Sequence, residues 1–403
     1  RTPDQRDRMS EILITFNPGS STIKLGLYRM AEDGPVRLGR GVIDLRRTPL
    51  LLHVVEGPAV ADIPLRAEVT EDLHELIDET LGWLSDHFAL QGIAAAGHRV
   101  VHGGDAFSGA TLITDDTLAT IARFVDLAPL HQPQSLRLIR AIRHLRPDLP
   151  QTASFDTAFH RTQSDIVRRF ALPREMFDAG IKRYGFHGLS YKFVASKLRE
   201  LAPDLAAGRV VAAHLGSGAS LCALENGESR DTSMGFSTLD GIPMATRCGA
   251  LDPGVVIHLL KQQGQSLASV EDILYHRSGL LGVSGISADS RDLLGSDQPA
   301  AREAIELFTH RIAQEIAALA TTLGGVDAVI FTAGIGEHQP AIRAAVCARL
   351  AWLGVTLDDN ANSASATRID AQDSKVGIFV IPTDEEQVIA TEACALLTSS
   401  REA

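Results

Sequence analysis

Three segments of the chain combine glycine with hydroxyl, imidazole or ammonium side chains, a combination suited to phosphate binding. They read NPGSSTIK at 17–24, HLGSGAS at 214–220 and FTAGIGEH at 331–338. Glycine allows the backbone N–H groups of a turn to come close to an anion. The chain contains no Walker A sequence, so phosphate recognition would use a different geometry.

The first segment predicts a tight turn at Gly19. Ser20, Ser21 and Thr22 add hydroxyl donors, and Lys24 adds a cation that we assign to the nucleotide. An ordinary hairpin turn would explain the same residues, because glycine and serine are common in such turns.

The second segment follows the apolar run Val210–His214. Gly216 and Gly218 let the backbone approach a phosphate, and Ser217 lies between them. His214 stands where a donor could reach that phosphate, although a histidine packed beside a strand is the plainer interpretation. Glycine on both sides of Ser217 favours a phosphate loop.

The third segment follows the run Val326–Thr332, which predicts a buried strand. Gly334 and Gly336 then lie at the carboxyl end of that strand, ahead of a helix, where α/β sheets bind ligands. A tight strand-to-helix connection is the alternative, and the pair lacks the third glycine of a dinucleotide fingerprint. We interpret the segment as a nucleotide contact.

Two arginines and two acids complete the set of candidate residues. Arg99 lies in the predicted loop HRVVHGG and Arg247 in ATRCGALDPG, where a guanidinium could hold a carboxylate or phosphate with two hydrogen bonds. Asp156 and Glu385 follow apolar runs, at the expected ends of strands, and Mg²⁺ is usually held by one or two carboxylates with substrate phosphates. Surface ion pairs, solvated acids and a helix N-terminus at Glu385 are the plainer alternatives.

These groups together meet the demands of phosphoryl transfer. That reaction needs phosphates held in line with the acceptor, charge neutralised by metal and cations, and water kept out. Two guanidinium groups would also cancel the charge of an acceptor carboxylate. We therefore predict a phosphotransferase that moves the γ-phosphoryl group of ATP to a small acid.

The overall charge excludes several other classes of partner. A formal net charge of -12 argues against nucleic acid or an anionic membrane surface, because both require an excess of Lys and Arg. No apolar run approaches the roughly 20 residues that span a bilayer. The cysteines have no CxxC spacing and are interpreted as reduced thiols of a cytoplasmic protein; they are Cys222, Cys248, Cys347 and Cys394.

Strand and helix patterns alternate along the chain, which predicts an α/β protein of two domains. Strands are expected at Ile12–Phe16, Ile23–Tyr28, 92–97, Val210–His214, Ala219–Leu224, Val326–Thr332 and Val376–Ile381, and helices at Leu73–Phe88, Ser135–Leu145, about Ala300–Leu323, about Pro340–Leu353 and after PTDEEQ. The segments ITFNPGSSTIKLGLY and VAAHLGSGASLCALE align with each other, which indicates a strand–turn–strand unit in each half. Arg1–Arg8 lack an apolar core and are interpreted as a disordered lead-in or tag remnant rather than a secretory signal, with Met9 as a start.

Ten segments, in order from residue 17 to residue 386, resemble the acetate kinase family, which includes propionate and butyrate kinases. They are NPGSSTIK, GHRVVHGG, APLHQP, FDTAFH, YGFHGLSY, HLGSGAS, ATRCGALDPG, YHRSGLLGVSGIS, FTAGIGEH and IPTDEE. The resemblance implies two RNase H-like domains with a cleft between them, as in actin, heat-shock chaperones and sugar kinases. It also implies a homodimer joined largely through the second domain.

The implied domains are 9–156 with 388–403, which carries the acid, and 157–387, which carries the nucleotide and the dimer interface. Family roles transfer residue by residue. The implied catalytic residues are Asn17, Arg99, Asp156, His187 and Arg247, with Asn17, Asp156 and Glu385 near Mg²⁺ (or Mn²⁺ as a substitute). The implied nucleotide contacts are Lys24, His214, Leu215, Gly216, Ser217, Gly218, Asp289, Ser290, Arg291, Gly334, Ile335, Gly336 and Glu337; the implied acid contacts are Arg99, His131, Val100, Leu127 and Pro243.

Three positions depart from the usual family pattern. Ser217 stands where many members have Asn, Ala250 where many have Asp, and Ala245 replaces a Gly. These departures indicate a sub-branch, and they bear on the choice of nucleotide and acid.

The resemblance implies direct in-line transfer from ATP to acetate, giving acetyl phosphate and ADP reversibly, once the domains close and expel water. Propionate or butyrate kinase is the alternative within the family, because one methylene is worth only roughly 1–3 kcal/mol of discrimination. A non-catalytic ATP-binding module of the actin type is the alternative from another class. The paired arginines argue against it, since a nucleotide switch needs no carboxylate clamp.

Overall fold

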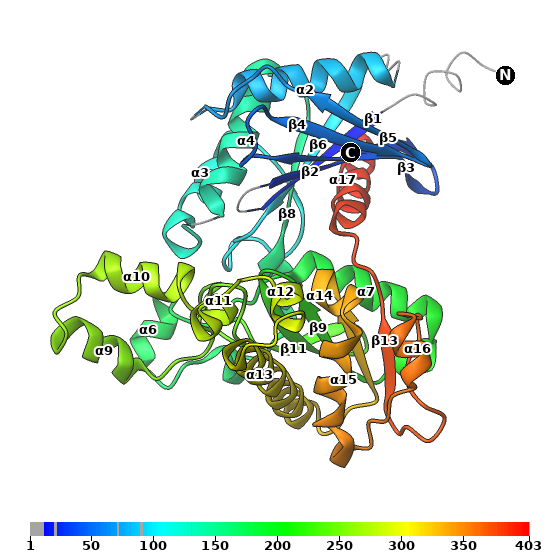
Figure 1. Ribbon diagram of the computed structural model, residues 1–403. Helices are drawn as coiled ribbons and strands as arrows, with labels where there is room; N and C mark the ends of the chain where they lie inside the picture. The colour runs from blue at the N-terminus through cyan, green and yellow to red at the C-terminus, as the bar shows by residue number, and fades with distance from the viewer. Residues whose placement is uncertain (1–11, 20–21, 71, 89–91, 130, 403) are drawn as a thin grey trace. The chain divides into compact units, whose positions relative to one another are not determined.

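The computed structural model describes residues 12–19, 22–70, 72–88, 92–129 and 131–402. The lead-in at 1–8 and the hydroxyl donors Ser20 and Ser21 lie outside these residues. The chain divides into two compact units (Figure 1): Arg1–Ala158 with Asp384–Ala403, called unit 1, and Phe159–Thr383, called unit 2. In the part so described, every helix is too short or too polar to span a bilayer.

Unit 1 contains an eight-stranded sheet in the order β5-β4-β3-β2-β1-β6-β8-β7. Strands β1 to β5 pair antiparallel with their chain neighbours, whereas β6 and β8 run parallel to β1. The strands are β1 Ile12–Pro18, β2 Thr22–Ala31, β3 Gly34–Asp44, β4 Leu51–Glu56, β5 Ala59–Pro64, β6 Ile93–Val100, β7 Thr111–Leu112 and β8 Gln151–Phe155. The helices are α2 His74–His87, α3 Asp115–Ala122, α4 Gln132–Leu145 and α17 Glu385–Glu402, with a 3₁₀ turn at Val125–Leu127.

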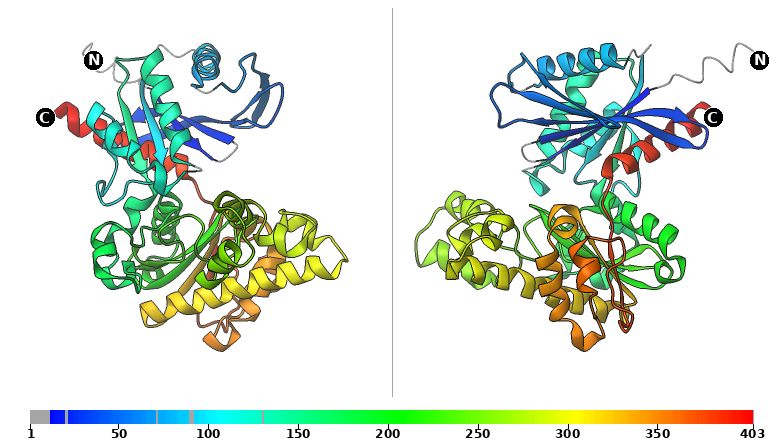
Figure 2. Two further views of the ribbon diagram at one scale, coloured as in Figure 1. Left: turned by 90° about the vertical axis from the view of Figure 1, so that its left-hand side faces the viewer. Right: turned by 45° about the vertical axis from the view of Figure 1, so that its right-hand side comes forward.

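Helices cover both faces of this sheet, and β1 is therefore buried along its whole length. Ile12, Ile14 and Phe16 pack with side chains of α2 and α4 in one cluster. Leu13 packs with α17 in another cluster on the opposite face (Figure 2). Successive strand residues point to opposite faces, so a residue's position along β1 decides which helix it meets.

Gly97 allows α17 to lie close against the centre of the sheet. An added Cβ at Gly97 would come within 2.8 Å of Cγ2 of Ile389 and 3.5 Å of Cβ of Ala393, both on α17. Ile389 and Ala393 are fully buried. The branched side chain of Ile389 and the short one of Ala393 have no room to move aside in a close-packed interior. Glycine at this position thus sets the distance between helix and sheet.

Unit 2 contains a five-stranded sheet in the order β11-β10-β9-β12-β13. Its strands are β9 Arg209–Leu215, β10 Ala219–Glu225, β11 Glu228–Thr232, β12 Ala328–Thr332 and β13 Gly377–Val380. Its longer helices are α7 Gly188–Leu201, α9 Pro253–Lys261, α10 Leu267–His276, α13 Pro299–Leu323 and α15 Pro340–Ala348. Its shorter helices are α5 Asp165–Arg168, α6 Arg174–Asp178, α8 Pro203–Ala206, α11 Gly279–Ser284, α12 Ser290–Leu294, α14 Ala333–His338 and α16 Asp359–Ser363, with 3₁₀ turns at Asp156–Thr162 and Ala351–Leu353.

The helix predicted at about residues 300–323 is confirmed as α13, and its apolar stripe lies in the core. Phe308, Ile312, Ile316 and Leu319 are buried, and the helix packs on β9 and β10 before ending at Gly324, which has a left-handed φ of 70°. On the other side of the sheet, α7 packs in a cluster with residues of β9, β10, β12 and β13. Unit 2 therefore also carries helices on both faces of its sheet.

The two units share one strand arrangement. The order β3-β2-β1-β6-β8 in unit 1 matches β11-β10-β9-β12-β13 in unit 2, with the first three strands antiparallel and the last three parallel. In this match β1 corresponds to β9 and β2 to β10, which are the two segments that align in sequence. The predicted fold class, α/β with a repeated strand–turn–strand unit, is confirmed.

Three local predictions were wrong in detail. Arg99 lies on β6 rather than in a loop, because the strand continues to Val100 before the glycines begin. AGIGEH forms the short helix α14 itself rather than a loop ahead of a helix. The next helix stops at Ala348 instead of Leu353.

Glu385 begins α17, so the helix N-terminus offered as its plainer interpretation is confirmed. Its place beside a magnesium ion stays a prediction.

The close packing at Gly97 predicts that a change to alanine lowers stability there but raises it at Gly82, where there is open space. Gly97→Ala should lower the free energy of unfolding by about 1–3 kcal/mol, because the methyl group overpacks against Ile389. Gly82→Ala is the matched control: Gly82 lies on α2 with no atom near an added Cβ, so alanine should raise stability by up to about 1 kcal/mol. Urea denaturation measures both; a stabilising Gly97→Ala would contradict the packing argument.

Candidate active site

Three parallel strands of unit 1 present polar side chains to α17 at their carboxyl ends. On β1, Asn17 shares the face of Leu13, which packs on α17. On β6, Arg99 shares the face of Gly97, and on β8 the side chains of Ala153 and Phe155 pack in a different cluster. The next residue, Asp156, therefore points to the same face of the sheet as Asn17 and Arg99.

Hydrogen bonds join these three side chains directly. Arg99 donates from Nε to Oδ1 of Asp156 over 2.9 Å and from Nη2 to Oδ2 over 2.6 Å. Its Nη1 donates to Oδ1 of Asn17 over 3.0 Å. Side chains of Arg99 and Asp156 are only 13% and 1% exposed, so this is a buried, doubly hydrogen-bonded ion pair of the kind that fixes guanidinium orientation.

The first turn of α17 adds two carboxylates to this cluster. Nδ2 of Asn17 donates to Oε2 of Glu385 over 2.8 Å and to Oε1 of Glu386 over 2.7 Å. Nη1 of Arg99 lies 3.5 Å from Oε2 of Glu385. Acids are favoured at a helix N-terminus by its positive dipole, so the helix start and the polar cluster stabilise each other.

Lys24 lies beside the same cluster. It pairs with Asn17 across β1 and β2, which places both side chains on one face. Its charge acts on Glu386 in the direction that lowers the pKa of that carboxyl. Lys24 is therefore a second cation, with Arg99, beside the carboxylates of this cluster.

Burial and charge shift the pKa values of this cluster in opposite directions. Burial alone would lower the pKa of Arg99, but the charges of Asp156 and Glu385 reverse this and raise it. Burial raises the pKa of Glu386, and the neighbouring charge of Glu385 adds to the increase. Arg99 is therefore a permanent cation, while Glu386 resists ionisation.

The cluster suits a magnesium ion that is shared with a substrate. Among the described residues, no three His, Cys, Asp or Glu side chains converge as a complete metal site. Mg²⁺, however, usually takes only one or two carboxylates and completes its shell with water and phosphate oxygens. Asp156, Glu385 and the amide oxygen of Asn17 are hard oxygen donors of this kind.

Unit 2 brings two histidines together at the N-terminus of α7. The rings of His187 and His214 stack with centroids 4.1 Å apart and planes 15° apart. His187 precedes the helix in a left-handed conformation, with φ of 56°. His214 lies on the face of β9 that packs on α7, and its Nδ1 lies 2.8 Å from Oγ of Ser190 on that helix.

The phosphate-loop prediction falls on the turn between β9 and β10. Leu215 pairs with Ala219, so Gly216 to Gly218 form the connection. An added Cβ at Gly218 would lie 2.7 Å from Nη2 of Arg247 and 3.6 Å from Nε2 of His187. Ser217 is exposed at the tip of the turn. Within unit 2, the structure thus brings the predicted residues His187, His214 and Arg247 to this turn.

Arg247 lies close to this turn and donates to a backbone group beside it. Its Nη1 donates to the carbonyl oxygen of Thr238 over 2.6 Å, and burial lowers its pKa. The backbone N–H of Ala245 donates to the carbonyl oxygen of Ser217 over 3.2 Å, which fixes the segment of Arg247 against the turn. A buried guanidinium of this kind favours an anionic ligand.

The predicted nucleotide segment on α14 is held by a buried arginine that the sequence did not predict. Arg343 is fully buried and donates to the carbonyl oxygens of Gly336 and Glu337 over 2.8 and 3.0 Å. It also donates to Oδ1 and the carbonyl oxygen of Asn362 over 2.8 and 2.7 Å. Arg343 therefore fixes the end of α14 against α16, and no sequence motif marks it.

The other predicted nucleotide residues keep their own local partners. Asp289 caps α12 and forms a two-bonded ion pair with Arg291, whose side chain is 79% exposed. Ser290 accepts a hydrogen bond from Gln339, over 2.7 Å. The carboxylate of Glu337 accepts from the backbone N–H groups at 333 and 383, and Gly334 and Ile335 lie in the same short helix.

The predicted acid-contact residues lie in both units. Val100 is fully buried in the cluster of α4 and β8, on the face opposite Arg99. Leu127 lies in the 3₁₀ turn Val125–Leu127, and His131 directly precedes α4. Pro243 is a half-buried residue of unit 2. The structure leaves their assignment to an acid as a prediction.

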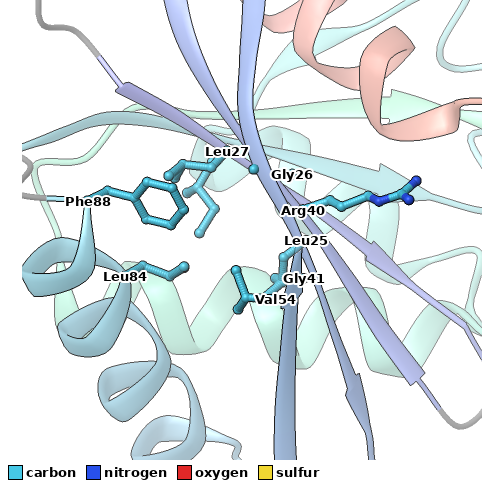
Figure 3. A pocket seen from close by; sticks show the side chains of 10 residues that line it. Leu25, Gly26, Leu27, Arg40, Gly41, Val54, Leu84 and Phe88 are labelled. Carbon is cyan, nitrogen blue, oxygen red and sulfur yellow. The ribbon is translucent and has the colours of Figure 1, made fainter. Parts of the chain in front are cut away.

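A small gap inside unit 1 is a packing defect rather than a site. It lies between β1 to β4 and α2 and has a volume of about 10 Å³, room for one water at most. Apolar side chains such as Leu25, Leu84 and Phe88 surround it, and Arg40 turns away from them (Figure 3). No polar group converges on it.

Two units with sheets of this strand order, a glycine turn beside Arg247 and a guanidinium cluster at Arg99 indicate a phosphotransferase of the actin-like fold. Solved structures agree: a propionate kinase from Francisella tularensis has a TM-score of 0.87 at 34% identity, covering 95% of this chain and 98% of that one. Porphyromonas gingivalis acetate kinase has a TM-score of 0.85 at 33% identity, covering 96% and 100%.

Sequence comparison identifies the family. The model of the acetokinase family matches residues 12–391. An acetate kinase from Rhodopseudomonas palustris is 47% identical over 401 residues, covering 98% of this chain and all of that protein, and one from Methylocella silvestris is 44% identical over 398 residues, covering 96% and 98%. The chain belongs to the acetokinase family, and the resemblance seen in its sequence motifs is confirmed.

The half-buried carboxyl of Glu386 predicts a pH-dependent stability difference. Its raised pKa means that the folded state holds the proton more tightly than the unfolded chain, where a glutamate titrates near pH ~4.3. Stability from this group is therefore complete below that pH and falls as pH rises through the folded-state value. Glu386→Gln should unfold at a higher temperature than wild type at pH 8, and the difference should vanish near pH 4.

Thermal unfolding in EDTA at several pH values measures this difference. Glu32→Gln, on the exposed turn between β2 and β3, is the matched control and should follow the wild-type curve. A Glu386→Gln variant that is less stable at pH 8, or equally shifted at every pH, would contradict the burial argument.

Proposed function

We propose that this chain is an acetate kinase that transfers the γ-phosphoryl group of ATP to acetate, reversibly and by direct in-line transfer. The observation that carries the proposal is the buried cluster of Asn17, Arg99, Asp156 and Glu385 in a member of the acetokinase family. Its relatives at 44–47% identity are named acetate kinases. A non-catalytic nucleotide switch would have no use for this clamp.

Arg99 is suited to bind the carboxylate of the acid. A guanidinium has five N–H donors, and Asp156 and Asn17 engage three of them in this structure. One N–H on Nη2 has no role in these bonds, while Nη1 also lies 3.5 Å from Glu385, and the bonds to Asp156 hold the guanidinium in a fixed direction. Arg99 thereby lowers the charge repulsion between the acid and the γ-phosphate.

His187 and Arg247 are suited to stabilise the moving phosphoryl group. Both side chains border the turn at Gly218, where backbone N–H groups can receive a phosphate. Donors aimed at charge that develops on equatorial oxygens lower the barrier, because they need no reorganisation. We assign Asn17 of unit 1 to the same step as a further amide group.

Magnesium is part of this proposal. Asp156, Glu385 and Asn17 would hold the ion, which would neutralise phosphate charge and orient ATP when bound. Hydrogen bonds from Asn17 and Arg99 already hold these carboxylates in a fixed orientation.

We also propose a cytoplasmic homodimer joined through unit 2. The described cysteines are all free thiols, as is usual in a reducing compartment. Helix α9 is largely apolar but has no buried residue. Large apolar side chains are exposed on it at Val255 and Ile257 and near it in sequence at Leu251 and Leu267, and such a group of exposed apolar side chains is typical of an interface. Light scattering of the purified protein measures the mass, and a mass of one chain at micromolar concentration would contradict the dimer.

The two arginines give a direct test of the mechanism. Arg99→Ala and Arg247→Ala should each lower kcat at least about 100-fold, because each removes preorganised charge stabilisation. Arg46→Ala, an arginine whose side chain is 70% exposed, is the control and should keep normal turnover. Circular dichroism verifies folding, and near-normal kcat in either of the first two variants would refute the assigned roles.

The acid substrate is tested by trapping the product with hydroxylamine. ATP and acetate should give acetohydroxamate, and omission of Mg²⁺ should abolish it. Acids of two, three and four carbons are then compared by kcat/KM, with acetate expected to be preferred over propionate, about 10-fold or more for one methylene. A preference for the longer acids would assign the chain to the propionate or butyrate kinases; no acyl phosphate from any acid would end the proposal.

A further inference from the structure

The hydroxyl of Ser220 lies between a histidine and a tyrosine. Its Oγ lies 2.8 Å from Nδ1 of His187 and 2.5 Å from the phenol oxygen of Tyr191. Ser220 and Tyr191 are both fully buried. The three side chains therefore form a short chain of hydrogen bonds that begins inside unit 2 and ends on the imidazole of His187.

The strand pattern explains why these groups meet. Ser220 shares the α7-facing side of β10 with Cys222, which packs in the cluster of α7, and it pairs across the sheet with His214. Tyr191 lies in the first turn of α7, four residues after His187, which precedes that helix. The start of the helix and the start of the strand thus bring both hydroxyls close to the imidazole.

The opposite edge of the His187 ring faces the phosphate turn. An added Cβ at Gly218 would lie 3.6 Å from Nε2 of His187 and 2.7 Å from Nη2 of Arg247. Nδ1 therefore points to protein hydroxyls, and Nε2 points to the turn at which we propose phosphate binds. Which nitrogen carries the proton decides whether the ring donates or accepts a hydrogen bond there.

Proton counting favours one tautomer. A serine hydroxyl has a single proton, and a phenol is a better donor than an alkyl hydroxyl, so Tyr191 should donate to Ser220. Ser220 then has its proton left for Nδ1 of His187, which must accept it. In a histidine the bond made by one ring nitrogen sets the state of the other, so Nε2 carries the N–H.

We propose that Ser220 and Tyr191 are positioning residues that hold neutral His187 as the Nε2–H tautomer, ready to donate to the transferred phosphoryl group. Only the identity of the hydrogen-bond acceptor, the transferred phosphoryl group, rests on the proposed function. A neutral donor suits this place, because Arg247 already supplies a positive charge at the same turn and the stacked ring of His214 covers one face.

The tautomer is read by NMR on the full chain labelled with ¹⁵N-histidine. His187→Gln identifies the signals of His187 by their loss. Wild type should show a pyrrole-like Nε2 and a pyridine-like Nδ1 for this ring. Ser220→Ala and Tyr191→Phe should each shift both nitrogens toward mixed values; a wild-type proton on Nδ1, or shifts unchanged in both variants, would overturn the proposal.

Ser190→Ala is the matched control, because it removes the same hydroxyl from Nδ1 of the stacked partner His214. It should leave the tautomer of His187 in place. If Ser190→Ala changes the His187 signals as much as Ser220→Ala does, the hydroxyls act through general packing and the inference fails.

Kinetics test the consequence for catalysis. Ser220→Ala should lower kcat about tenfold with KM for ATP and acetate little changed, less than the roughly 100- to 1,000-fold cost of losing a donor outright. Tyr191→Phe acts through Ser220, so it should have little further effect in the Ser220→Ala background, whereas a packing role would give additive losses. Additive losses would contradict the chain of bonds. Absence of all kinase activity, with the NMR result as expected, would overturn the proposed function and not the tautomer.

Discussion

The polar architecture of unit 1 depends on the buried ion pair between Arg99 and Asp156. An unpaired charge at such a depth would cost several kcal/mol, so neither residue could occupy its position without the other. Their paired hydrogen bonds over 2.9 and 2.6 Å also remove the rotational freedom of a long side chain. The guanidinium therefore meets an incoming anion in an orientation that folding has already set.

Successive residues of a β-strand point to opposite faces of the sheet, and this alternation positions the polar residues of both units. Asn17, Arg99 and Asp156 take the face of unit 1 that meets α17, and His214 and Ser220 take the face of unit 2 that meets α7. The strand order is the same in both units. One geometric rule thus yields an acidic cluster with a cation in one half and a stacked imidazole pair in the other.

Local patterns were enough to predict much of the fold, because hairpins, apolar stripes and glycine stops act over short distances. The strands Ile12–Pro18 and Thr22–Ala31 and the helix Pro299–Leu323 follow from such patterns. The partners of Arg343 and the contact of Glu386 with Asn17 could not be predicted, because they join residues distant in the chain. The family motifs supplied the candidate site residues, but not the hydroxyl chain beneath His187.

The return of the chain to unit 1 through α17 has a consequence for synthesis. The strands of unit 1 emerge from the ribosome first, the whole of unit 2 follows, and only then does the helix appear that covers Leu13, Tyr28 and Ala95. Until that moment an apolar strip of the first half stays open to water, and Glu385 and Glu386 have not been translated. Because transiently exposed apolar surface favours aggregation, the first half of the chain is most exposed to that risk during the long delay between strand and helix.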